Sequence, residues 1–126
     1  MKILKANLKN TPFKTEINTE NHVLYADEPL ELGGGNTAPS PFELLVASLA
    51  SCTLITLRMY ANRKEWEIEE IKLQIEHDEA SKQVYRVIEL LGANAEVNKD
   101  RMLLIANKCP IHKLLETVLN IKTEII

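Results

Sequence analysis

One segment dominates the sequence, the apolar run from Leu44 to Tyr60 in a chain of 126 residues. The run has the length and composition of a buried helix. The polar residues within it leave it short of the roughly 18 to 20 apolar residues that a membrane span requires, so we expect a core helix and no membrane partner. A helix that is apolar on nearly all sides must be covered on nearly all sides, and a chain this short has few other elements for that task. The sequence therefore predicts a homodimer. The interrupting polar residues are Ser48, Ser51, Thr53, Thr56 and Arg58.

The start of this helix carries a strong local signal. Ser40 is a good N-cap, Pro41 suits the first helical position, and Glu43 lies three residues after Ser40, which together match a capping box. The loop before it, Gly33-Gly34-Gly35-Asn36-Thr37-Ala38-Pro39, has the glycines of a turn. The pattern predicts a helix from Pro41 to about Lys64.

The remaining segments predict a single α+β domain over residues 1–126. Three short β-tolerant runs come first, then the long helix, then two alternating runs joined by the turn 78–83, then two helices and a final strand. The expected order is β-β-β-α-β-β-α-α-β. The expected strands are residues 3–8, 13–18, 22–25, 71–77, 84–91 and 121–126, and the expected later helices are 99–108 and 110–119.

Composition excludes several classes of function. With 45% hydrophobic and 26% charged residues and a formal net charge of -3, the chain has an ordinary globular composition and no basic surface for nucleic acid. The N-terminal ten residues contain no apolar run of signal-peptide length, so we expect a cytoplasmic protein with reduced thiols. Reducing compartments disfavour structural disulfides and leave cysteines for metal binding or catalysis.

The two cysteines, Cys52 and Cys109, are the candidate catalytic residues. Cys52 lies within the long helix, on a face whose residues should enclose the thiol in a mostly apolar pocket. Such a pocket alone would raise the pKa of the thiol, and a small buried core side chain is the alternative interpretation. The residues sharing the face of Cys52 are Leu45, Ser48, Leu49, Ile55, Thr56 and Met59.

Cys109 precedes Pro110 at the expected start of a helix, where unpaired N–H groups favour a thiolate. Lys108, His112 and Lys113 add positive character, and basic groups at helix N-termini commonly make cysteines reactive. The alternative is that Cys109 serves only as an N-cap.

Other chemistries have weaker support in the sequence. Two cysteines with His77 or His112 lack the spacing of a zinc site, and a Cys52–His112 hydrolytic dyad lacks an orienting third group. The triple glycine at 33–35 lacks the Gly-Lys-Ser/Thr ending of a phosphate loop. We therefore expect no metal and no cofactor.

The chain contains two longer motifs, Gly-Gly-Gly-Asn-Thr-Ala-Pro-Ser-Pro-Phe-Glu-Leu-Leu-Val-Ala-Ser-Leu-Ala-Ser-Cys at 33–52 and Lys-Cys-Pro-Ile-His-Lys-Leu at 108–114. Together these motifs resemble the OsmC/Ohr family. The resemblance implies an OsmC-like α+β fold, an intertwined homodimer in which antiparallel sheets enclose two long central helices.

The resemblance also implies an activity. Family peroxidases reduce organic hydroperoxides through a first cysteine that becomes a sulfenic acid and a second that resolves it as a disulfide. Those roles fall here on Cys52 and Cys109, with a small apolar peroxide as substrate and a dithiol, such as a protein lipoyl group, as reductant.

The chain departs from the peroxidase branches at the activating residues. Those branches have a glutamate ten residues before the first cysteine, where this chain has Phe42, and Glu43 is explained by the capping box. They also have an arginine in the N-terminal strands, whereas the first arginine here is Arg58. The expected protein thus belongs to a branch without the usual arginine and glutamate. The alternatives to a peroxidase are a non-enzymatic protein that binds a small apolar ligand and a redox sensor.

Overall fold

The computed structural model describes residues 1–126 and divides them into two compact units, residues 1–45 and 46–126. The element order matches the expected β-β-β-α-β-β-α-α-β, with two additional short 3-10 turns, η1 (Leu30–Leu32) and η2 (Glu96–Asn98). The boundary between the units falls inside the long helix α1 (Pro41–Arg63). The single α+β architecture predicted from the sequence is thereby built from two parts.

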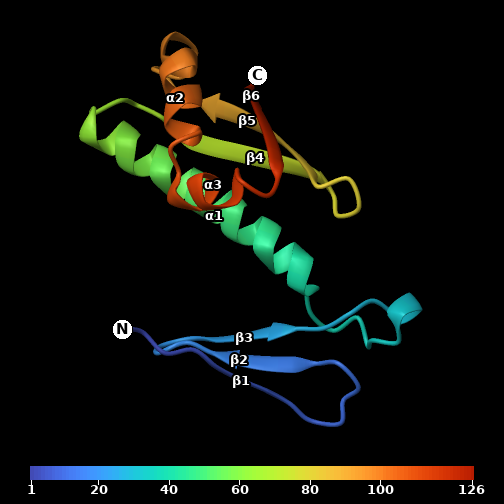
Figure 1. Cartoon of the computed structure of the whole chain (residues 1–126). Coiled ribbons are helices and arrows are strands. Elements are labelled where there is room, and N and C mark those ends of the chain that lie inside the picture. The colour runs from blue at the N-terminus through green and yellow to red at the C-terminus, as the bar shows by residue number, and fades with distance from the viewer. The chain divides into compact units, whose positions relative to one another are not determined.

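The first unit is built on an antiparallel meander. The strands β1 (Lys5–Leu8), β2 (Thr15–Asn18) and β3 (Val23–Ala26) pair in that order (Figure 1), with Ala6 opposite Ile17 and Ile17 opposite Leu24. Each strand is four residues long, shorter than expected for the first two. Many of the unit's apolar side chains remain exposed, among them Ile3, Leu8, Val23, Leu24 and Tyr25.

The loop between β3 and α1 is organised by the buried carboxylate of Asp27. Its oxygens accept hydrogen bonds from the backbone N–H groups of Glu28, Gly35 and Thr37 and from the hydroxyl of Thr37. The backbone of Gly34 passes so close to that of Glu28 that a Cβ at residue 34 would lie 2.0 Å from the Glu28 carbonyl oxygen. The glycines therefore shape this loop, as the sequence indicated.

Helix α1 begins with the predicted capping box. The backbone N–H of Glu43 donates to Ser40 Oγ at 3.2 Å, and the backbone N–H of Ser40 donates to Glu43 Oε1 at 3.2 Å. The helix ends at Arg63, one residue before the expected end. Glu43 is engaged in the cap, which confirms that its role is structural.

One stripe of α1 is buried and the opposite side is not. The buried residues recur at helical spacing, whereas Ile55 and Met59 are 53% and 67% exposed. The expectation that the helix must be covered on nearly all sides is therefore not met within one chain. The buried residues are Leu49, Thr53, Leu57, Tyr60 and Ala61.

We expected this helix to be too short and too polar to span a membrane. That expectation is wrong, because α1 is long enough and apolar enough for a membrane span when judged by length and composition alone. An 18-residue window of α1 has a mean hydropathy of 1.6, because serine and threonine lower the hydropathy only slightly. Core helices of soluble proteins have the same property, and a third of that window is buried inside the protein. The buried stripe of α1 packs into the hydrophobic core of the second unit through Leu57, Tyr60 and Ala61.

The second unit contains the sheet that carries the candidate site. The strands β4 (Glu70–Asp78) and β5 (Gln83–Leu91) form the expected antiparallel hairpin, and β6 (Asn120–Ile125) pairs with β5 in parallel. The prediction of antiparallel sheets is thus corrected for this one pair. The chain from β5 to β6 passes through two helices, and such a long connection can return the chain in the same direction.

The two connecting helices are α2 (Lys99–Ala106) and α3 (Pro110–Leu115). Both end earlier than expected. After Leu115 the chain tightens into turns in which the Val118 and Leu119 N–H groups both donate to the Leu115 carbonyl. The turn leads directly into β6.

The core of the second unit consists of two hydrophobic clusters. The larger one joins α1, α2, β4 and β5 (Figure 1) and includes Leu57, Ile88 and Met102. The smaller one consists of Leu49, Val84, Cys109 and Leu119, with Cys52 packed against it. The inner face of β5 places Val84, Arg86, Ile88 and Leu90 in one buried row, so that a single arginine lies in an apolar face.

Candidate active site

The structure brings the two candidate cysteines together. Cys52 comes from α1 and Cys109 from the N-cap of α3, and the two reduced thiols are hydrogen-bonded to each other within the smaller core cluster. Cys109 is fully buried, whereas Cys52 is partly exposed. The pair is therefore placed so that a reagent from solvent reaches Cys52 first.

The environment favours ionisation of Cys52. Burial opposes the charged form, but the hydrogen bond from Cys109, the backbone N–H of Ile111, the hydroxyl of Thr56 and the charge of Arg86 together lower the pKa of the Cys52 thiol. Two of these groups, Cys109 and Ile111, belong to the first residues of α3. The start of a short helix thus stabilises a thiolate on a different helix.

Cys109 has the opposite tendency. Burial and the neighbouring Cys52 raise the pKa of its thiol, although the sulfur accepts a hydrogen bond from the His112 backbone N–H at 3.4 Å. The sequence predicted that the helix N-terminus would favour a thiolate at Cys109, and the raised pKa shows that this expectation is wrong. The N-cap position is confirmed, but complete desolvation outweighs it.

The expected enclosure of Cys52 is only half present. Of the residues on its helix face, Leu49 is buried, but Leu45, Ile55 and Met59 are at least 37% exposed. The apolar neighbours of the thiol pair come mainly from the sheet and from α3 instead. They are Ile75, Ile111, Leu115 and Ile121.

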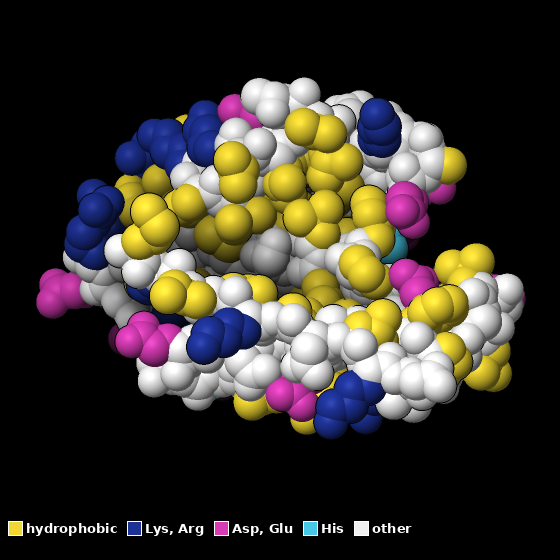
Figure 2. All heavy atoms as spheres, turned by 60° about the horizontal axis from the view of Figure 1, so that its bottom comes forward, with side chains coloured by type: hydrophobic (Ala, Val, Ile, Leu, Met, Phe, Trp, Pro, Cys, Tyr) yellow, Lys and Arg dark blue, Asp and Glu magenta, His cyan; other side chains and the backbone are white.

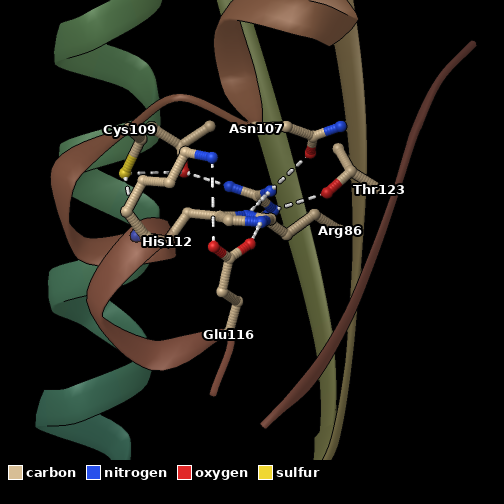
Figure 3. A network of polar contacts seen from close by, with 8 residues as sticks. Arg86, Asn107, Cys109, His112, Glu116 and Thr123 are labelled. Atoms are coloured by element: carbon tan, nitrogen blue, oxygen red, sulfur yellow. Dashed lines mark hydrogen bonds and ion pairs between the residues drawn. The ribbon is translucent and has the colours of Figure 1, made fainter. Parts of the chain in front are cut away.

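A buried arginine, which the sequence analysis did not identify, completes the site. Arg86 is fully buried on β5, and its guanidinium is hydrogen-bonded to four neutral groups (Figure 3). No ion pair joins it to a carboxylate. Its contacts are to Thr123 Oγ1 at 2.8 Å, Thr53 Oγ1 at 2.6 Å, Asn107 Oδ1 at 3.2 Å and His112 Nδ1 at 2.6 Å.

The charge of Arg86 interacts electrostatically with both cysteines. Burial lowers the pKa of Arg86, and the charges of Cys109 and Cys52 raise it. Thr53 links the arginine to the pair: its hydroxyl donates to the Leu49 carbonyl at 2.7 Å, accepts from Arg86, and lies 4.0 Å from Cys109 Sγ. A thiolate is thus the anion available to balance this cation.

His112 is a neutral member of this network and not the positive group expected beside Cys109. Burial and the charge of Arg86 lower the pKa of His112, and its Nδ1 must be unprotonated to accept from Arg86. Its Nε2 faces Glu116 Oε2 at 3.5 Å (Figure 3). His112 therefore has an orienting carboxylate, but its free electron pair faces Arg86 and is unavailable as a base toward Cys52.

A sequence signal for Arg86 existed in the alternation of β5. Val84, Ile88 and Leu90 mark the buried face at every second residue, and Arg86 falls in the same register. An arginine in a buried register position requires partners, and that requirement makes it a candidate for a functional site.

The structure contains no group of three histidine, cysteine or acidic side chains placed to hold a metal ion. His77 is on β4, and the glycines 33–35 belong to the loop around Asp27 in the first unit.

Solved structures of other proteins share this fold. A protein of Psychrobacter arcticus named for osmotic stress induction and detoxification is 22% identical, with a TM-score of 0.87 over 100% of this chain and 96% of that one. An organic hydroperoxide resistance protein OsmC of Legionella pneumophila is 21% identical, with a TM-score of 0.78 over 99% and 96%. An OsmC-like protein of Mycoplasma pneumoniae is 18% identical, with a TM-score of 0.82 over 100% and 96%. No curated protein matches the sequence.

The sequence comparison with protein families agrees with the fold. The profile of the OsmC-like protein family matches residues 33–124, which include both cysteines, Arg86 and His112. The glycine loop, the capped helix and the Cys-Pro start of α3 all lie inside this match. The chain belongs to the OsmC-like protein family.

Proposed function

We propose that this protein is a thiol peroxidase that reduces organic hydroperoxides, with Cys52 as the peroxidatic and Cys109 as the resolving cysteine. The observation that carries the proposal is the contact between two reduced thiols whose pKa values are shifted in opposite directions, next to a buried arginine without a carboxylate. The more acidic thiol is also the more accessible one. A two-cysteine peroxidase needs one accessible, acidic thiol to attack the peroxide and a second, protonated thiol beside it to form the disulfide.

The first step is attack of the Cys52 thiolate on the terminal oxygen of the hydroperoxide. The O–O bond breaks, the sulfur is oxidised to a sulfenic acid, and the alkoxide takes up a proton to leave as an alcohol. The positive charge of Arg86 and the backbone N–H of Ile111 stabilise the attacking thiolate. Arg86 thereby supplies positive charge in a chain that has no arginine in its N-terminal strands.

In the second step the Cys109 sulfur attacks the Cys52 sulfenic acid. A disulfide forms, and the hydroxyl of the sulfenic acid leaves with the thiol proton of Cys109 as water. A raised pKa keeps Cys109 protonated until that moment, so it does not compete with Cys52 for the peroxide. An external dithiol then reduces the disulfide by exchange and restores both thiols.

The apolar surroundings support a small apolar substrate. Leu49, Ile75, Ile111 and Leu115 lie in the cluster against which Cys52 packs, and an alkyl or aryl peroxide gains more than hydrogen peroxide from such contacts.

We propose further that the protein acts as a homodimer in the cytoplasm. Hydrophobic side chains gather on the face shown in Figure 2. The exposed side chains of Ile55 and Met59 on α1 support the dimer.

The direct test is consumption of cumene hydroperoxide by the reduced protein with excess dithiol, beside hydrogen peroxide and the Cys52→Ser variant. We expect Cys52-dependent turnover with a preference for the organic peroxide. Without dithiol, Cys109→Ser should still consume one equivalent of peroxide and accumulate a sulfenic acid that dimedone traps, because attack precedes resolution. A wild-type rate no higher than that of free thiol would reject the proposal.

The second candidate function is binding of a small apolar ligand without catalysis. It is favoured by an open hollow of about 580 Å³ on the second unit, lined by Leu54, Ile55, Met59 and Ile71 among others. Under this alternative, Cys52→Ser should leave the affinity for an apolar fluorescent probe unchanged and peroxide consumption should be absent in both forms. A redox sensor would instead form the disulfide once without turnover.

A further inference from the structure

The guanidinium of Arg86 is held by four acceptors, and one of them differs from the rest. The oxygens of Thr53, Asn107 and Thr123 accept hydrogen bonds at any pH between 4 and 9, since hydroxyl and amide groups do not ionise there. The Nδ1 atom of His112 accepts only while the imidazole is neutral. Its contact of 2.6 Å with Arg86 is one of the two shortest of the four.

Protonation of His112 would reverse this contact. Nδ1 would then carry a hydrogen that faces an N–H of Arg86 at 2.6 Å, and two positive charges would meet in a buried space without a carboxylate on the arginine. One of the two side chains must move. Displacement of Arg86 would change the acidity of the thiols, because its charge acts on both Cys52 and Cys109.

We propose that His112 is a positioning residue that holds Arg86 against the cysteine pair only in its neutral form, so that acid releases Arg86 and lowers the reactivity of Cys52. The inference rests on the proposed function only in taking Cys52 as the nucleophile.

The charged groups around His112 come from β5, from α3 and from the turn after α3. Arg86 on β5 contacts Nδ1, Glu116 in the turn lies 3.5 Å from Nε2, and Lys113 on α3 acts through its charge. Burial and Arg86 lower the pKa of His112 from its usual 6.5, Glu116 raises it and Lys113 lowers it. Cys109 lies on the backbone side of the residue, where its sulfur accepts the His112 N–H. The neutral, positioning form therefore prevails at neutral pH and is lost only in acid.

The test measures alkylation of Cys52 by iodoacetamide from pH 4.5 to 8, with the modified peptide quantified by mass spectrometry. This reagent needs no peroxide activity. The key variant is His112→Asn, whose amide oxygen replaces Nδ1 as an acceptor that cannot be protonated. His22→Asn, a change of an exposed histidine in the first unit, is the matched control.

For the wild type we expect a region below neutral pH in which the rate falls more steeply than tenfold per pH unit, because thiolate formation and neutral His112 are both required. In His112→Asn the fall should be tenfold per unit throughout, as for a single ionisation. In Glu116→Gln the pH range in which the alkylation rate falls more steeply than tenfold per unit should move to lower pH. Glu116 raises the pKa of His112, so its removal lets His112 stay neutral in stronger acid.

Equal slopes for the wild type and His112→Asn, with both proteins folded by circular dichroism, would overturn the inference. A purely structural role would lower the melting temperature of the variant without changing the slope. The two proposals can fail separately. If the pH slopes of alkylation differ between the wild type and His112→Asn but no peroxide is turned over, the role of His112 stands and the peroxidase is rejected. If peroxide is turned over but the two slopes are equal, the peroxidase stands and the role of His112 is rejected.

Discussion

At the residue scale, the unusual group in this protein is a buried cation with neutral partners. Arg86 has four hydrogen bonds and no carboxylate, although burying a charge without a counter-ion is costly. A paired carboxylate would reduce the influence of the guanidinium on the thiols. The neutral partners position Arg86 while leaving its charge available to Cys52 and Cys109.

Asp27 provides a stability prediction at the same scale. Its hydrogen bonds, first that from the Thr37 hydroxyl and then those from the Glu28 and Thr37 backbone, lower its pKa from 3.8 to about 2. A carboxyl with a depressed folded-state pKa stabilises the folded protein above the unfolded pKa, and this contribution is lost as pH falls from about 4 to 2.

Asp27→Asn should therefore lower the urea midpoint at pH 7 and remove part of the decline seen in the wild type between pH 4 and 2. Urea unfolding at a series of pH values measures both effects. Glu31→Gln in the same loop region, at a carboxylate in the first turn of η1, is the control and should leave that decline in place. An Asp27→Asn protein that keeps the full acid decline would contradict the prediction.

At the scale of elements, the capping box anchors the start of the helix that carries Cys52. Ser40→Ala removes the acceptor for the Glu43 N–H and should lower the free energy of unfolding by about 1 kcal/mol. Ser51→Ala is the matched control, because the Ser51 hydroxyl only donates back to helix carbonyls at residues 47 and 48 and should change stability little. Chemical denaturation of both variants decides the point. Equal stabilities would show that α1 does not depend on its cap.

At the scale of the whole molecule, the chain leaves apolar surface that one copy does not cover. Ile55 and Met59 lie on the exposed side of α1, and several side chains of the first unit are exposed as well. Surface of this kind marks an interaction site in soluble proteins. The proposed second copy of the chain would cover it.

We expect sedimentation equilibrium to give twice the chain mass of 14.3 kDa for the wild type and a single chain mass for Met59→Glu. A charge placed at a buried interface is strongly unfavourable, which is the reason for the expected dissociation. Val97→Glu, at a residue that is 80% exposed in η2, is the control and should remain dimeric. A wild type that sediments as one chain would reject the dimer.

Local rules were sufficient to predict much of this protein from its sequence. The order of elements, the capping box of α1, the N-cap role of Cys109 and the family resemblance depend on residues close together in the chain, and all are confirmed. The direction of β6 and the acidity of each thiol depend on contacts across the chain. Burial raises the pKa of Cys109 where the sequence predicted a thiolate, because desolvation is set by everything packed around a group.

The contacts of Arg86 in the candidate site also could not be predicted from local sequence patterns. Its place on the buried face of β5 follows from alternation, but its partners come from α1, α3, β6 and the turn after α2, at sequence separations of 21 to 37 residues. No local pattern predicts which side chains meet at such distances. The sequence by itself determined the elements and the two cysteines, and the tertiary structure decided which thiol ionises, because the charge and the desolvation that control it come from residues distant in the chain.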